Sequence, residues 1–170
     1  MNNRDLLKRF VDIAQAEVGV REVGGNNCGD RIREYQSATW LAPGAWPWCA
    51  AFVAWCLREW LQEEGVADAL KLHSLSAWRC RDASAFGWEK WAKANKLKVL
   101  TETEKAKAGD LVIFDFSHIG IVAEDQHGDF IKTIEGNTNG KGERDSVSGD
   151  GVWNKIRQQA LTKCYIRLLA

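Results

Sequence analysis

One cysteine of the chain stands where a thiol could act as a nucleophile. Cys49 follows a proline-broken loop and begins the apolar run Ala50-Ala51-Phe52, which predicts the first turn of a buried helix. The unpaired N–H groups at the N-terminus of a helix carry a partial positive charge, and this charge stabilises a thiolate. A thiolate is the form of cysteine that attacks carbonyl carbons, so Cys49 is a candidate nucleophile.

Two further motifs supply the polar groups that a nucleophilic cysteine needs. Ser117-His118-Ile119-Gly120 places a histidine at the start of a strand-like run, and Glu135-Gly136-Asn137 ends the next such run. An imidazole can take the proton of the thiol, and a carboxylate or amide can orient the imidazole. A cysteine at a helix start would by itself be read as a small core residue, and only the ordered combination points to chemistry. The predicted parts of a cysteine hydrolase are Cys49, His118, Glu135 and Asn137.

The hydrophobic pattern indicates the elements that must position these groups. Helix-type runs come first, at residues 4–18, 30–37, 49–62, 74–80 and 84–95. The run 49–62 is apolar on nearly every side, which predicts a central core helix that stops at Gly65. Strand-like runs follow at 111–114, 119–122, 130–134 and 164–169. Helices followed by antiparallel strands indicate an α+β domain with a central helix packed on a sheet.

The turn at residues 125–129 joins two of these strands into a hairpin. If the turn centres near His127, paired residue numbers sum to about 253 or 254, and His118 lies opposite Glu135 or Gly136. Opposed residues have Cβ atoms ~5 Å apart, so an imidazole and a carboxylate could meet there. A shift of one residue would move every side chain to the other face, so the sequence predicts proximity and not facing.

Composition excludes several classes of protein. A chain of 170 residues with 45% hydrophobic content predicts one domain, residues 1–170. A formal net charge of zero provides no field that would attract nucleic acid. No apolar run approaches the ~20 residues of a transmembrane helix. The polar N-terminus also lacks the apolar block of a signal peptide, so synthesis in the cytoplasm is expected.

The five cysteines predict free thiols. Their number is odd, they are widely spread, and no Cys-x-x-Cys pair occurs, which fits neither a disulfide framework nor a zinc site. Cys49 and Cys56 are seven residues apart, a helical rise of ~10.5 Å, whereas bonded cysteines have Cα atoms within ~7 Å. Cys56 is therefore interpreted as a core residue below Cys49, and no cofactor is predicted.

Three blocks of sequence, in this order, closely resemble the CHAP family: residues 48–53, 109–122 and 134–139. That family comprises papain-like cysteine amidohydrolases and peptidases that cut bacterial peptidoglycan, and it is related to the NlpC/P60 hydrolases. Residues 22–27 resemble its phage-associated branch. The resemblance covers most of the chain, from about residue 13 to the end, and implies a papain-like (NlpC/P60-like) fold. By motif position it implies Cys49 as nucleophile, His118 as general base, Glu135 as the orienting residue and Asn137 as a further polar member.

The resemblance also implies an activity. The expected enzyme is an N-acetylmuramoyl-L-alanine amidase or a peptide endopeptidase that works through a thioester, as a phage lysin or a secreted antibacterial effector. It would reach the cell wall or periplasm after release or delivery, with a holin, a secretion system or an immunity protein as partner. A monomer is expected, with peptidoglycan or a muropeptide as substrate. Two alternatives stay open: a cysteine amidase of a small-molecule amide, and a non-catalytic wall-binding module of the same fold.

Residues before the nucleophile are the candidates for binding substrate. Trp46 and Trp48 flank Cys49 and could line a cleft. The backbone N–H of Cys49 is an expected donor to the oxyanion of the reaction. The sequence does not choose among three candidates for a second donor, which are Tyr35, Gln36 and Asn26.

The same loop bears on metal binding. Some phage lysins of the CHAP family carry an acidic calcium loop just before the nucleophile. Residues 41–48 contain no carboxylate, and calcium sites usually include carboxylate oxygens. The sequence therefore predicts no metal at this loop.

Overall fold

Six helices precede all six strands in the computed structural model, which describes residues 1–140 and 149–170. The helices are α1 (Asn3–Ala16), α2 (Asp30–Gln36), α3 (Cys49–Trp60), α4 (Val66–Leu70), α5 (Leu75–Trp78) and α6 (Gly87–Ala94). The strands are β1 (Lys98–Leu100), β2 (Leu111–Phe114), β3 (His118–Val122), β4 (Phe130–Thr138), β5 (Gly151–Gln158) and β6 (Thr162–Arg167). A short 3₁₀ turn, Gln159–Leu161, joins the last two strands.

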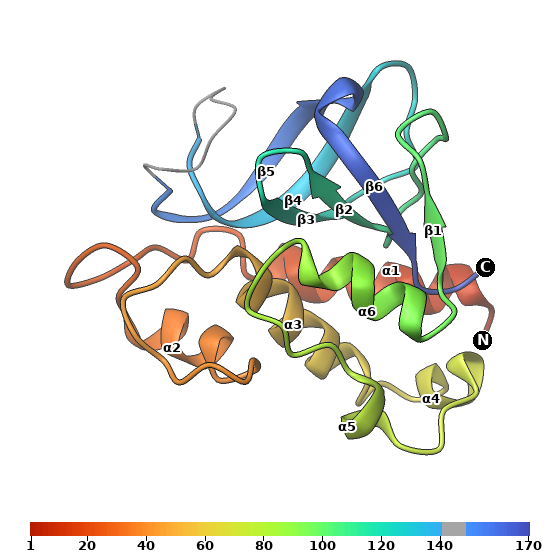
Figure 1. Cartoon of the computed structure of the whole chain (residues 1–170), viewed down its shortest axis with the longest axis horizontal. Helices are drawn as coiled ribbons and strands as arrows, with labels where there is room; N and C mark the ends of the chain where they lie inside the picture. The colour runs from red at the N-terminus through yellow and green to blue at the C-terminus, as the bar shows by residue number, and fades with distance from the viewer. Residues whose placement is uncertain (141–148) are drawn as a thin grey trace.

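The strands form one antiparallel sheet in the order β1-β6-β2-β3-β4-β5. The helices gather on one side of this sheet, with α3 against it (Figure 1). The predicted α+β class, with a central helix packed on an antiparallel sheet, is confirmed. No helix among the described residues has the length and apolar character needed to cross a membrane.

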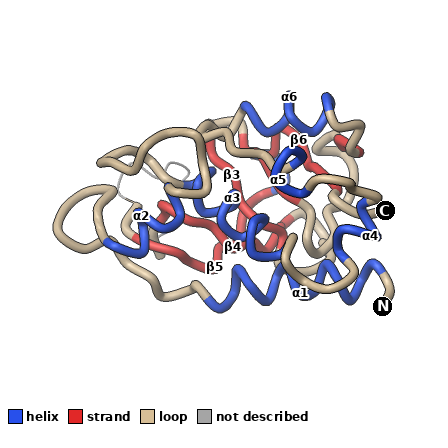
Figure 2. Tube along the Cα trace, turned by 90° about the horizontal axis from the view of Figure 1, so that it is seen from below, coloured by secondary structure: helices blue, strands red, loops and turns tan. Residues whose placement is uncertain are grey.

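The central helix α3 owes its position to its composition. Ten of its twelve residues are buried, so that a stretch apolar on nearly every side lies inside the molecule. In the view of Figure 2, α3 runs between α1 and α6. Its C-terminal end is tied to α1 by Trp60, whose indole N–H donates to the carbonyl of Leu6 at 2.8 Å and whose ring packs on Phe10.

Side chains alternate between the two faces of the sheet, and both faces are covered. The face toward the helices contributes Leu111, Ile113, Ile119, Ile121, Ile134 and Ile166 to the main core. The opposite face carries a smaller cluster that includes Val112, Phe114, Val122, Ile131 and Tyr165. Burial on both faces explains why β2 and β3 read as continuous apolar runs in the sequence.

Three elements differ from the sequence prediction. The short helix α4 and the strands β1 and β5 were not expected. Gly65 precedes α4 at φ +85° and does not end α3, which stops five residues earlier at Trp60. In β5 the buried positions include Lys155 and Arg157 while Ile156 between them is exposed, so the strand lacks the usual apolar alternation.

The predicted hairpin register was wrong by one or two residues. The strands β3 and β4 pair at Ile121–Ile134 and Val122–Thr133, whose residue numbers sum to 255. The connection between the strands extends from residue 123 to residue 129, and the pairing centres between His127 and Gly128. If this register is continued, Gly120 lies opposite Glu135, and His118 comes two residues before Gly120 in β3.

Candidate active site

Cys49 is the first residue of α3 and lies where the helix exposes its N–H groups. Trp48 occupies the cap position with φ −122° and makes no side-chain cap hydrogen bond. The backbone N–H groups of Ala50 and Ile119 favour the charged form of the sulfur. Burial raises the pKa of the Cys49 thiol, but the charge of His118, its hydrogen bond and these N–H groups outweigh burial, so the pKa lies below its ordinary value.

The break in the sheet makes room for this sulfur. Among the described residues, pairing of β3 with β4 stops at Ile121, and the strands separate toward His118. Ile119 lies in the part of β3 that is unpaired with β4, and its backbone N–H lowers the pKa of the Cys49 thiol. The tip of α3 therefore meets the sheet where two neighbouring strands diverge.

His118 begins β3 and is almost completely buried, with 1% of its surface exposed. Its side chain interacts electrostatically with Cys49, and its Nε2 lies 2.7 Å from Oε1 of Glu135. Burial lowers the pKa of the imidazole, but the thiolate of Cys49 and the carboxylate of Glu135 together raise it to about 9. A lowered thiol pKa and a raised imidazole pKa both favour a thiolate–imidazolium pair.

A glycine of the Ser-His-Ile-Gly motif lets the carboxylate reach the imidazole. A Cβ added to Gly120 would lie 2.7 Å from Cγ of Glu135, closer than such atoms approach. The side chain of Glu135 thus crosses Gly120 to meet His118 on the same face of β3, two residues away. Position 120 therefore requires a glycine. Because the Glu135 side chain crosses it, His118 and Glu135 lie close together as predicted, although the predicted register was wrong.

Glu135 accepts hydrogen bonds on both of its oxygens and is fully buried. Besides His118, it is bound by the hydroxyl of Thr133 at Oε2 and by the guanidinium of Arg157. Arg157 donates from Nε to Oε2 at 3.0 Å and from Nη2 to Oε1 at 2.6 Å. Burial raises the pKa of Glu135, but the hydrogen bonds from His118 and Arg157 lower it to about 2.

The glycine of the Glu-Gly-Asn motif brings β4 against the start of α3. A Cβ at Gly136 would lie 2.6 Å from Cβ of Phe52 and 2.9 Å from the ring of Trp48. The backbone of β4 therefore packs directly on the first helical turn, which carries Cys49. This contact fixes the strand that holds Glu135 relative to the helix that holds the sulfur.

Two phenylalanines cover a face of the imidazole. The rings of Phe114 and Phe116 lie 6.0 and 5.7 Å from the ring of His118, with planes within 20° of parallel. Both phenylalanine rings also lie 5.4 Å below the guanidinium of Arg157. The aromatic pair therefore contacts two of the three partners of Glu135, His118 and Arg157.

Asn137 is buried and adopts a left-handed backbone conformation with φ +54°. It follows Gly136 at the point where the register of β4 with β5 shifts, between Glu135 and Thr138. Of the two residues that could orient the imidazole, Glu135 makes the hydrogen bond to Nε2. A role for Asn137 in the reaction stays a prediction.

The structure does not place Tyr35 or Gln36 as oxyanion donors. The hydroxyl of Tyr35 is buried and donates to Glu17 at 2.5 Å. The amide group of Gln36 donates to the carbonyls of Gly44 and Trp46, so both of its N–H bonds are used within the loop before Cys49. Their burial follows from helix packing, which the sequence pattern does not specify.

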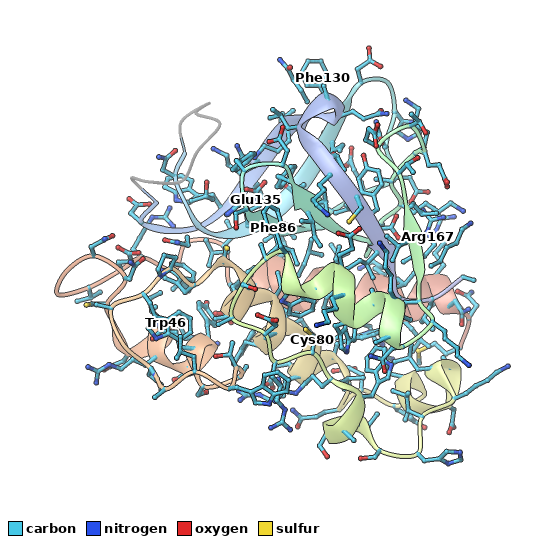
Figure 3. The ribbon with its side chains drawn as sticks, in the orientation of Figure 1. Trp46, Cys80, Phe86, Phe130, Glu135 and Arg167 are labelled. Carbon is cyan, nitrogen blue, oxygen red and sulfur yellow. The ribbon has the colours of Figure 1, made fainter. Side chains whose placement is uncertain are left out.

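The remaining candidates lie closer to the surface, with one exception. Trp48 is fully buried, stacks on Tyr35 at 5.6 Å and donates its indole N–H to Glu22 at 2.9 Å. The expectation that Trp48 lines a cleft is therefore wrong. Trp46 is half-buried in the loop before α3 and donates to the carbonyl of Ala42 (Figure 3). Asn26 is exposed in the loop that precedes α2.

Sequence reasoning missed Thr133 and Arg157, which complete the shell around Glu135. Two charged residues two positions apart, Lys155 and Arg157 on either side of Ile156, were the available signal. All five cysteines are free thiols, and the described residues contain no group of three or more histidine, cysteine or acidic side chains that could hold a metal ion.

Comparison with known families adds an independent observation. A family model described as the CHAP domain matches residues 41–137, which is more than half of the chain. The matched range contains Cys49, His118, Glu135 and Asn137, and it ends before β5 begins. A search of curated protein sequences found no match to the chain.

Proposed function

The chain belongs to the CHAP family, and we propose that it is a cysteine hydrolase that cleaves an amide bond of bacterial peptidoglycan. The CHAP domain is typical of cysteine- and histidine-dependent amidohydrolases and peptidases. The observation that carries the proposal is the buried series Cys49–His118–Glu135, in which the thiol pKa is lowered by a histidine that a carboxylate orients.

The reaction follows from the positions of these groups. His118 takes the proton of the thiol, and the thiolate of Cys49 attacks the carbonyl carbon of the amide. The oxyanion that forms is stabilised by N–H groups at the start of α3, with the backbone N–H of Cys49 as the proposed donor. The C–N bond then breaks as the imidazolium protonates the leaving amine, and a thioester remains on Cys49.

The second half of the reaction restores the enzyme. A water molecule gives a proton to His118 and its oxygen attacks the thioester carbonyl. The carboxylic acid product leaves, and Cys49 and His118 return to their starting state. Glu135 keeps the imidazole ring in one orientation through both halves and stabilises its positive charge.

Two other functions would give different observations. A wall-binding module of the same fold would gain nothing from a lowered thiol pKa, so the environment of Cys49 favours catalysis. A cysteine amidase of a small-molecule amide would use the same groups, and family membership favours peptidoglycan over that substrate. The proposed setting is a phage lysin or a secreted antibacterial effector, acting on the wall after release, with a holin, secretion system or immunity protein as partner.

Digestion of purified sacculi tests the proposal and identifies the bond. Fragments released by the wild-type protein would be separated and weighed by mass spectrometry, with Cys49→Ala as the blank. Intact stem peptides freed from glycan would indicate an amidase, and cut peptides left on glycan would indicate an endopeptidase. Release by Cys49→Ala equal to that of the wild type, or thioester formation with a soluble amide and none with sacculi, would overturn the proposal.

A further inference from the structure

We propose that Arg157 is a positioning residue of this site, which holds Glu135 in place and sets the pH range in which the Cys49–His118 pair is reactive. The inference deepens the proposed function and rests on it for its biological meaning. Arg157 lies on β5, outside the range that the family model matches.

The geometry leaves the carboxylate one orientation. Oε1 of Glu135 accepts from His118 and from Nη2 of Arg157, and Oε2 accepts from Thr133 and from Nε of Arg157. A two-point contact between guanidinium and carboxylate fixes the plane of the carboxylate as well as its distance. The oxygen that faces His118 is therefore held by Arg157 from the other side.

The same two phenylalanine rings contact both Arg157 and His118. Phe114 and Phe116 stack with the imidazole and lie under the guanidinium. Arg157 itself is 4% exposed. A movement of the guanidinium would thus disturb both the carboxylate and the rings that contact His118.

Stability alone does not account for such a pair. Removing two charges from water costs several kcal/mol per ion, and apolar residues of similar volume often stabilise a core as well or better. The buried pair of Arg157 and Glu135 instead ends a series of alternating charges: guanidinium, carboxylate, imidazolium and thiolate. Each group in such a series stabilises the charged form of the oppositely charged group next to it.

In the part of the chain that the structure describes, two other charged side chains flank this series, Lys155 and Asp115. Lys155 precedes Arg157 on the same face of β5 and donates to the carbonyl of Asn139 at 2.8 Å. Asp115 lies in the exposed turn between β2 and β3, next to Phe116. Removing the positive charge of Arg157 makes the surroundings of the reactive pair more negative. The pKa values of the Cys49 thiol and of the His118 imidazolium should then both rise.

The test is the pH dependence of alkylation of Cys49 by iodoacetamide, followed by mass spectrometry in the full-length protein. In Arg157→Met the midpoint of thiolate formation should move to higher pH by about 1 unit. In Arg157→Lys the charge stays but the two-point contact is lost, so the midpoint should hold while the plateau rate falls several-fold.

The chain offers a matched control on the same sheet. Arg167 on β6 makes an equivalent two-point contact with Asp110, at 3.0 and 2.7 Å, and is also largely buried. It lies well away from Glu135 in Figure 3. Arg167→Met removes a pair of the same kind and should leave the alkylation midpoint where it is in the wild type.

An unshifted midpoint in a folded Arg157→Met, equal to that of Arg167→Met, would overturn the proposal. If Arg157→Met does not fold by circular dichroism, Arg157→Lys decides, and a plateau rate equal to that of the wild type would overturn it. Alkylation needs no substrate, so failure to digest sacculi would count against the proposed function and leave this test intact.

Discussion

The two thiols of helix α3 have pKa values that are shifted in opposite directions. Cys49 begins α3 and Cys56 lies two turns further along it, and both are buried. Burial raises the pKa of both thiols. The pKa of Cys49 nevertheless lies below its ordinary value, whereas that of Cys56 lies well above.

The sign of the neighbouring charges makes the difference. Beyond burial, the pKa of Cys56 is raised by the carboxylates of Glu17 and Glu59. Cys49 instead faces an imidazole and two backbone N–H groups. A buried thiol on a helix is therefore not reactive by its position alone. The strand β3 carries His118, which lowers the pKa of the Cys49 thiol.

The largest expected difference between the two positions is in hydrolysis. Cys49→Ser should lower the rate of sacculus digestion by about 10³-fold or more, because a hydroxyl is a far weaker nucleophile in this setting. Cys56→Ser should stay within about threefold of the wild type, since Cys56 contacts only the core. Turbidity loss of a sacculus suspension measures both. Equal losses in the two variants would contradict the assigned roles.

A smaller effect is expected in thiol labelling. Iodoacetamide near neutral pH should modify Cys49 about 100-fold faster than Cys56, because only Cys49 is a thiolate there. His118→Ala should remove most of that advantage while the fold, checked by circular dichroism, persists. Peptide mapping of the labelled protein gives the ratio. Labelling of Cys49 that is unchanged in His118→Ala would show that the helix, and not the histidine, activates the thiol.

The smallest effect concerns the alkaline limb of the activity profile. The leaving amine needs a protonated imidazole, so activity should fall as pH rises through the His118 pKa of about 9. Glu135→Gln removes the charge that supports the imidazolium, so its decline should begin about 1 pH unit lower.

Glu17→Gln is the matched control for this profile. It removes the carboxylate that faces Cys56 and should leave the limb in place, because Glu17 contacts Arg31 and Tyr35 and not His118. A limb that moves equally in both carboxamide variants would argue against a direct link between Glu135 and the imidazole.

Local patterns in the sequence were enough to predict the central helix and three site residues. The motifs around Cys49, His118 and Glu135 are short, and each lies on an element that stands out in the sequence as an apolar run. The diagonal contact across Gly120 could not be derived, because the length of the hairpin connection did not fix the register.

The remaining errors of the sequence prediction concern residues whose burial depends on tertiary packing. Trp48 is a loop residue that turns inward to stack on Tyr35, and sequence alone does not give that direction. Strand β5 was missed because Lys155 and Arg157 occupy positions where an apolar residue is expected. Their burial depends on carbonyl and carboxylate partners from β4 and the loop after it.

The division of the site between α3 and the sheet has a consequence for the newly made or partly opened chain. Cys49 is synthesised before His118, Glu135 and Arg157, and its thiol is ordinary until the strands dock on the helix. Any opening that separates the sheet from the helix returns the thiol to its ordinary pKa. Activation of Cys49 therefore depends on the completed fold, in which the sheet brings His118 to the start of α3.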